Sequence, residues 1–137
     1  MRWTKGPHSS NQLAAYLKPR IGGAFKGIVC HDTPTSYRTK GRAGWIVNID
    51  PKGEAGKGTH WTALCVDGPR SYYYDPAGYP PPRPLFETLK RQGLMPLYST
   101  TKSQVGGNDC GARSAYALER LVLSKNPAAT FRDVLAA

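Results

Sequence analysis

A strand-turn-strand pattern in the middle of the chain restricts most strongly how this protein can fold. Residues 60–66, HWTALCV, have the length and apolar content of a strand, and residues 71–75, SYYYD, have those of a second one. Between them, residues 67–70, DGPR, have the composition of a tight turn. The sequence therefore predicts a β-hairpin with His60 and Asp75 at its open end, where the two side chains can be neighbours.

Helical patterns lie on both sides of this hairpin. Ser9 and Gln12 have capping-box spacing, and apolar residues at helical spacing follow them until Lys18-Pro19, where we expect the N-terminal helix to stop. The fold class that follows is a small α+β domain with a central antiparallel sheet flanked by helices. The other expected elements are a short strand before Cys30, a strand at residues 45–49, a helix between Pro84 and Gly93, a strand at residues 94–99, a helix from Cys110 to about Asn126, and a final short turn or helix capped by Thr130.

Chain length and cysteine content restrict the class of protein. With 137 residues, the sequence suits one domain, residues 1–137, of which we expect residues 1–8 to be flexible. The apolar runs are far shorter than the roughly 20 residues that cross a bilayer, so we expect no membrane partner and no secretion. Three widely spaced cysteines without a C-x-x-C pair argue against a disulfide framework and a zinc ribbon, and favour a reducing compartment. We expect no metal.

The charge balance points to a polyanionic partner. The formal net charge is +10 and the isoelectric point is about 9.8, which makes nucleic acid the first candidate for a binding partner. The alternative is a basic surface that binds nothing, because the basic residues are scattered along the chain and form no run of five.

Cys110 has the sequence context of a reactive thiol. It stands where a glycine-rich loop, residues 104–109, turns into the apolar helix expected from Cys110 onward. At the positive end of a helix dipole a thiolate is favoured over a thiol, which lowers the pKa and creates a nucleophile. The alternative is a small buried hydrophobic residue, which is how we interpret Cys65 in the middle of its strand. Asp109 is expected to cap the helix or to stabilise the loop.

The chain also contains the other groups that a cysteine hydrolase needs. His60 can share a proton with the Cys110 thiol, and Asp75 can fix the imidazole. Gln104 lies six residues before Cys110, so its side-chain amide can bind an oxyanion together with the Cys110 backbone N–H. His60 as a surface residue and Asp75 as an ordinary turn residue are the alternatives. The neighbouring triplet 30–32, CHD, is a weaker candidate, since adjacent residues of an extended chain point to opposite faces.

These residues resemble those of the adenovirus-protease (adenain) and SUMO-protease clan of cysteine peptidases, in the order His, acidic residue, Gln, Cys. The resemblance covers residues 9–125 and rests on segments 46–48 (IVN), 58–61 (GTHW), 74–78 (YDPAG) and 104–111 (QVGGNDCG). It implies a papain-related fold with a catalytic triad of His60, Asp75 and Cys110 and with Gln104 as the oxyanion residue. It also implies that Trp61 walls the substrate site, although a core tryptophan is an equally good interpretation. We expect Gly107 and Asn108 to contact substrate.

The family implies a thiol endopeptidase of viral maturation, which cuts precursor proteins after small, Gly-Gly-type sequences inside the virion or the host cell. The chemistry requires no cofactor, and we expect a monomer. The adenovirus enzyme is activated by DNA and by a disulfide-linked peptide. The charge of +10 agrees with DNA, whereas the absence of cysteine between Asp67 and Asp109 leaves peptide activation open. Two alternatives remain: a deSUMOylase or deubiquitinase, and a nucleic-acid-binding protein on a degenerate protease scaffold.

Overall fold

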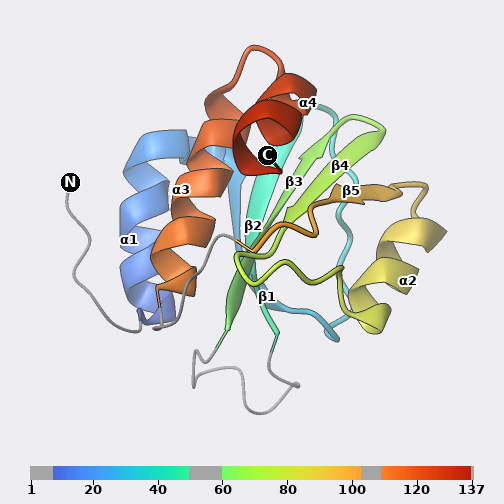
Figure 1. The fold of residues 1–137 in the computed structure, drawn as a ribbon, viewed down its shortest axis with the longest axis horizontal. Helices are drawn as coiled ribbons and strands as arrows, with labels where there is room; N and C mark the ends of the chain where they lie inside the picture. The colour runs from blue at the N-terminus through green and yellow to red at the C-terminus, as the bar shows by residue number, and fades with distance from the viewer. Residues whose placement is uncertain (1–7, 50–59, 103–108, 137) are drawn as a thin grey trace.

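The computed structural model describes residues 8–49, 60–102 and 109–136. A five-stranded mixed sheet in the order β1-β2-β3-β4-β5 forms the centre of the molecule, with helices on both faces (Figure 1). The elements are α1 (Ser10–Ile21), η1 (Gly22–Ala24), β1 (Phe25–Cys30), β2 (Arg42–Asn48), β3 (Trp61–Asp67), β4 (Arg70–Tyr74), α2 (Arg83–Arg91), β5 (Pro96–Tyr98), α3 (Cys110–Leu123), α4 (Pro127–Thr130) and the π-helical turn η3 (Phe131–Leu135).

The expected α+β class and the central hairpin are confirmed. Strands β2, β3 and β4 are antiparallel, and the β3–β4 hairpin turns at Gly68, whose φ of 62° is the left-handed conformation that glycine adopts without strain. The two outer strands differ from the expected antiparallel pairing, because β1 joins β2 and β5 joins β4 in parallel. Parallel neighbours need long connections, and the 30–42 and 74–96 segments provide them.

Both faces of the sheet are buried, each under its own set of helices. Helices α1 and α3 lie side by side on one face, and α2 covers the other (Figure 1). Alternate residues of β3 divide between the two cores: Trp61, Ala63 and Cys65 face α1 and α3, whereas Leu64 and Val66 face α2. Burial on both faces explains why these strands are nearly continuous apolar runs in the sequence.

The close approach of α3 to the sheet depends on Gly44 in β2. A Cβ atom at Gly44 would lie 2.5 Å from Leu118 Cδ1 and 3.0 Å from Leu118 Cγ. Leu118 is fully buried in the core between α1, α3 and the sheet. The missing side chain therefore provides the space that the α3 leucine occupies, which holds the helix tightly across β2 and β3.

The N-terminal helix differs from its prediction. Its capping box is confirmed, with Ser9 Oγ accepting from the Gln12 N–H at 3.2 Å and Gln12 Oε1 accepting from the Ser9 N–H at 2.8 Å. The stop at Pro19 is wrong, because α1 continues to Ile21. Proline removes one helical N–H, and other donors bind the carbonyls of the last turn. Arg20 Nη1 donates to the Tyr16 carbonyl at 2.7 Å, and the Gly22 N–H donates to the Lys18 carbonyl.

The C-terminal turn differs in its cap as well. Asn126 caps α4, its side chain accepting from the Ala129 N–H at 3.1 Å, whereas Thr130 makes no side-chain cap for η3. The Thr130 hydroxyl is bound instead to Ser124 Oγ at 2.6 Å. None of the helices in the described residues is long and apolar enough to cross a lipid bilayer.

We predict that Gly44→Ala lowers the free energy of unfolding by about 1–3 kcal/mol, because the new methyl group overpacks the Leu118 contact. Urea denaturation followed by circular dichroism measures the change. Gly41→Ala is the matched control, since a Cβ there meets no atom within 4 Å, and it should change stability by less than about 1 kcal/mol. Equal effects of the two substitutions would contradict the packing role of Gly44.

Candidate active site

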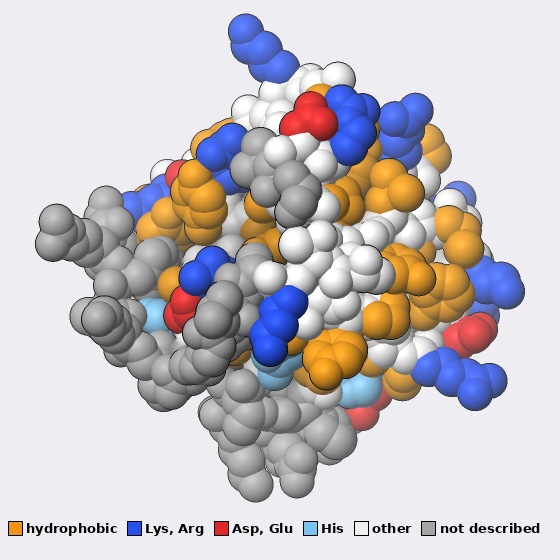
Figure 2. All heavy atoms as spheres, in the orientation of Figure 1, with side chains coloured by type: hydrophobic (Ala, Val, Ile, Leu, Met, Phe, Trp, Pro, Cys, Tyr) orange, Lys and Arg blue, Asp and Glu red, His pale blue; other side chains and the backbone are white. Residues whose placement is uncertain are grey.

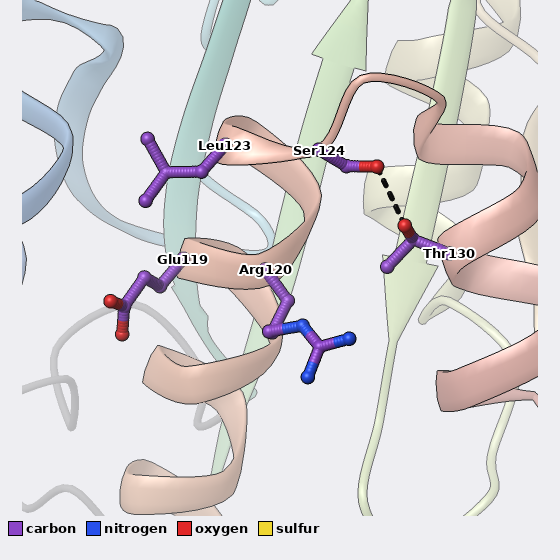
Figure 3. A pocket seen from close by; sticks show the side chains of 5 residues that line it. All are labelled: Glu119, Arg120, Leu123, Ser124 and Thr130. Carbon is purple, nitrogen blue, oxygen red and sulfur yellow. Dashed lines mark hydrogen bonds between the residues drawn. The ribbon is translucent and has the colours of Figure 1, made fainter.

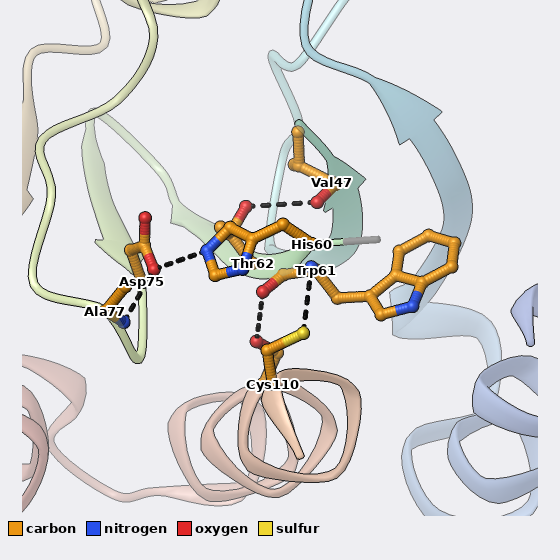
Figure 4. A network of polar contacts seen from close by, with 8 residues as sticks. Val47, His60, Trp61, Thr62, Asp75, Ala77 and Cys110 are labelled. Carbon is orange, nitrogen blue, oxygen red and sulfur yellow. Dashed lines mark hydrogen bonds and ion pairs between the residues drawn. The ribbon is translucent and has the colours of Figure 1, made fainter. Parts of the chain in front are cut away.

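His60 and Asp75 meet at the open end of the β3–β4 hairpin, as the sequence predicts. His60 Nε2 lies 2.7 Å from Asp75 Oδ1, and Figure 4 shows the imidazole between that carboxylate and the start of α3. The carboxylate is 4% exposed and the imidazole 25% exposed. A buried carboxylate bonded to one ring nitrogen orients the ring and leaves Nδ1 as the nitrogen that can exchange a proton with another group.

The turn after β4 fixes the Asp75 carboxylate. Oδ1 also accepts from the Ala77 N–H at 2.8 Å, and the Asp75 carbonyl accepts from the Gly78 N–H at 2.9 Å. Gly78 has a φ of 81°, and a Cβ there would lie 2.8 Å from the Thr100 carbonyl oxygen. The turn therefore requires glycine at residue 78 twice, once for its conformation and once for its packing against the Thr100 backbone.

Cys110 is the first residue of α3, and the helix packing brings it to the same place. It is 3% exposed, and its Sγ accepts a hydrogen bond from the Trp61 backbone N–H at 3.4 Å (Figure 4). The sulfur thus lies at a helix N-terminus and beside a backbone donor, the surroundings in which reactive cysteines are found. Asp109 holds the N-cap position without a side-chain cap, and its carboxylate accepts from Arg113 Nε at 2.7 Å instead.

The electrostatics of His60 follow from these two neighbours. The hydrogen bond to Asp75, followed by the hydrogen bond to Cys110, raises the pKa of His60 from 6.5 to about 10, and burial opposes the rise. The imidazolium form is thus the favoured one at neutral pH. An imidazolium between a carboxylate and a sulfur atom is the charge arrangement that a thiolate needs as its partner.

The other predicted site residues are Gln104, Gly107, Asn108 and Trp61, and only Trp61 lies in the described part of the chain. Gln104, Gly107 and Asn108 lie outside the described residues, so the oxyanion role and the substrate contacts stay predictions. Trp61 is 1% exposed, and its indole Nε1 donates to the His8 carbonyl at 3.0 Å. Its packing supports the core interpretation, rather than the site wall that the resemblance implied. His8 is itself buried, so ordered packing begins inside the segment expected to be flexible.

The other candidate residues lie in the interior of β3 and at the end of β1. Cys65 is fully buried, as expected, and burial raises its pKa to about 12, which keeps the thiol protonated. The triplet 30–32 lies at the end of the edge strand β1, two strands away from β3. Within residues 8–49, 60–102 and 109–136, no three His, Cys, Asp or Glu side chains form a group that could hold a metal ion.

A pocket of about 240 Å³ lies at the other end of α3 (Figure 3). Its charged side chains already have partners within the protein. Glu119 accepts from the Tyr16 hydroxyl at 2.6 Å, and Arg120 donates to the Tyr116 hydroxyl at 2.8 Å. These internal bonds make the pocket a weaker functional candidate than the Cys110 site. Its lining residues are Glu119, Arg120, Leu123, Ser124 and Thr130.

Comparison with known proteins supports the fold. No family model and no curated protein matches this sequence. Among solved structures, the chain is similar to the ASFV pS273R protease, with a TM-score of 0.63 and 18% identity over 96% of this chain and 66% of that one. A selenomethionine form of that protease gives a TM-score of 0.50 and 23% identity over 70% of this chain and 40% of that one. The chain thus spans just under two thirds of the ASFV protease and shares its fold.

The raised pKa of His60 leads to a prediction about pH. In the parent protein, the imidazole should titrate near pH 10 by NMR, and Asp75→Asn should shift the midpoint toward 6.5 because the largest cause is removed. A pKa raised by folding stabilises the protein fully below pH 6.5, and this stabilisation is lost as pH rises toward about 10. The difference in unfolding free energy between parent and His60→Gln should therefore shrink over that window. A parent midpoint near 6.5 would contradict the assigned contacts.

Proposed function

We propose that this protein is a cysteine peptidase in which Cys110 is the nucleophile, His60 the proton carrier and Asp75 the residue that orients the imidazole. One observation carries the proposal: a single imidazole is bonded to a buried carboxylate at 2.7 Å and lies beside the cysteine that begins a helix. The three residues come from different parts of the fold: Asp75 directly follows β4, His60 directly precedes β3, and Cys110 begins α3. The fold that the chain shares with a viral protease supports the same proposal.

The proposed reaction begins with the thiolate-imidazolium pair. The Cys110 sulfur attacks the substrate carbonyl carbon, and the electron pair of the C=O bond moves to the oxygen. His60 Nδ1 then donates its proton to the leaving amine as the C–N bond breaks, which leaves a thioester on Cys110. Water attacks the thioester while His60 accepts its proton, and the acid product leaves with the thiolate restored.

The oxyanion is the charge that the site must stabilise in both steps. The Cys110 backbone N–H lies in the first turn of α3, where N–H groups have no partner within the helix. We assign this donor and the Gln104 side-chain amide to the oxyanion. Losing one such donor typically costs about 2.7–4 kcal/mol in the transition state.

The proposed substrates are viral precursor proteins cut at small-residue, Gly-Gly-type sites. This part rests on the resemblance of the sequence motifs to viral maturation proteases and on the name of the structurally similar ASFV protease. A deSUMOylase or deubiquitinase uses the same three side chains and remains the alternative. Incubating the protein with tagged ubiquitin-like precursors and, in parallel, with Gly-Gly-containing viral precursor proteins distinguishes the two activities.

Nucleic acid is the proposed activator, and this proposal rests on the net charge of +10. On the face shown in Figure 2, Lys and Arg side chains are scattered over the surface rather than gathered in one patch. Scattered positive charge favours a diffuse, salt-dependent attraction to a polyanion over a shaped binding site. The same charge supports the third candidate, a nucleic-acid-binding protein without peptidase activity.

The catalytic assignment predicts that Cys110→Ser and His60→Ala each lower kcat on a cleavable peptide by about 10³-fold or more. Asp75→Asn should have a smaller effect, because the ring remains present but loses its orienting partner. Cleavage is measured by fluorescence with a quenched Gly-Gly peptide. Cys30→Ser is the control and should retain parental activity, since residue 30 lies in β1, which β2 separates from β3. Full activity of Cys110→Ser would exclude the proposed nucleophile.

The activator proposal predicts that duplex DNA increases the cleavage rate at about 50 mM salt and that the increase disappears at about 500 mM salt. Fluorescence anisotropy with labelled DNA measures binding in the same buffers. Tight binding without any cleavage or thiol reactivity would favour the nucleic-acid-binding alternative. Equal rates with and without DNA at low salt would remove DNA as an activator.

A further inference from the structure

The backbone of Trp61 lies at a point where β3 extends beyond its partner β4. The last paired residues of the hairpin at this end are Ala63 and Tyr74. Continuing the same register by two residues would set Pro76 opposite Trp61, and proline has no N–H to donate. The other edge of β3 already uses the His60 carbonyl, which accepts from the Ile49 N–H at 3.1 Å. Alternation along the strand therefore directs the Trp61 N–H and C=O away from β2.

Helix α3 supplies an acceptor for the Trp61 N–H and a donor for the Trp61 carbonyl. Cys110 Sγ accepts from the Trp61 N–H at 3.4 Å, and Ser114 Oγ donates to the Trp61 carbonyl at 2.9 Å. Residues 110 and 114 are one helical turn apart and so lie on the same face of the helix. Both bonds are buried, and Ser114 itself is 0% exposed. Figure 4 shows the Cys110 side of this arrangement.

We propose that Ser114 is a positioning residue for the Cys110 thiolate, acting through the backbone of Trp61. The Ser114 bond fixes the Trp61 carbonyl, which holds the Trp61 N–H on the sulfur, and Trp61 directly follows His60. The arrangement of Cys110, Ser114 and the Trp61 backbone, here called the Trp61 clasp, thereby sets the sulfur beside both its N–H donor and the imidazole. The inference rests on the proposed function, because it assigns Ser114 to the same thiol site.

Two features make the clasp more than a packing contact. Gly111 stands between Cys110 and Ser114, and a Cβ there would lie 3.1 Å from Trp61 Cδ1, so glycine allows the helix to approach the strand. A donor that faces sulfur stabilises the charged thiolate more than the neutral thiol, so its alignment affects reactivity and not only folding. A loosened clasp should therefore slow the reaction of the thiol even where the protein remains folded.

The test is the rate of Cys110 alkylation by iodoacetamide between pH 5 and pH 10, read by mass spectrometry of the Cys110 peptide in a Cys30→Ser background. Loss of one aligned hydrogen bond typically changes an equilibrium by about two- to tenfold, so Ser114→Ala should slow alkylation at pH 6 by about that factor and move the midpoint upward. Ser114→Thr retains the hydroxyl and should stay within about twofold of the parent.

Ser71→Ala is the matched control. Ser71 is also a buried serine whose hydroxyl donates to a backbone carbonyl, that of Leu94 at 3.1 Å, but it lies in β4 near the hairpin turn. It should lower the unfolding temperature as Ser114→Ala does and leave the pH profile unchanged. Equal profiles for Ser114→Ala and Ser71→Ala would overturn the proposal. So would a folded Ser114→Thr variant that is as slow as Ser114→Ala.

The alkylation assay separates this proposal from the proposed function. It needs no substrate, so a shifted profile in Ser114→Ala without any peptide cleavage would support the clasp and count against the peptidase. Cleavage that depends on Cys110, combined with an unchanged alkylation profile in Ser114→Ala, would support the peptidase and show that Ser114 does not position its thiol.

Discussion

The packing of α3 across β2 and β3 is the interaction on which the site depends. His60 and Asp75 are neighbours through the hairpin alone, but Cys110 reaches them only because its helix lies flat on the sheet. Two glycines make that approach possible, Gly44 beneath Leu118 and Gly111 beside Trp61. The position of the sulfur is therefore set by how closely the backbone of α3 packs on the sheet. The side-chain contacts at the site then orient the sulfur and the imidazole.

Local patterns in the sequence were enough to predict the parts of the fold with local causes. The hairpin, the capping box at Ser9 and the helix that starts at Cys110 all follow from short-range rules. The extension of α1 through Pro19 was missed because an arginine one residue later binds a carbonyl of the same turn, which periodicity does not reveal. The parallel edge strands were missed because their pairing depends on segments far apart in the sequence.

The site also has parts with local causes, which the sequence predicts, and parts that depend on distant segments, which it does not. Hairpin geometry predicts that His60 lies near Asp75, whereas only the family resemblance linked Cys110 to them. The core position of Trp61 was one of two open interpretations, and the sequence could not choose between them because a tryptophan after a strand-initial histidine suits both. Ser114 gave no signal as a site residue. A possible signal was the Asp75-Pro76 step, since proline at the end of one strand leaves the facing strand without a donor.

The close approach of Gly78 to Thr100 brings together two segments that are distant in sequence. The turn that fixes the Asp75 carboxylate rests on the backbone of residues 100–102, which leads toward the Gln104 loop. The space beside Gly78 is too small for a side chain, because a Cβ there would lie 2.8 Å from the Thr100 carbonyl oxygen. A side chain at residue 78 would therefore disturb the turn that fixes the Asp75 carboxylate and the backbone of residues 100–102 together.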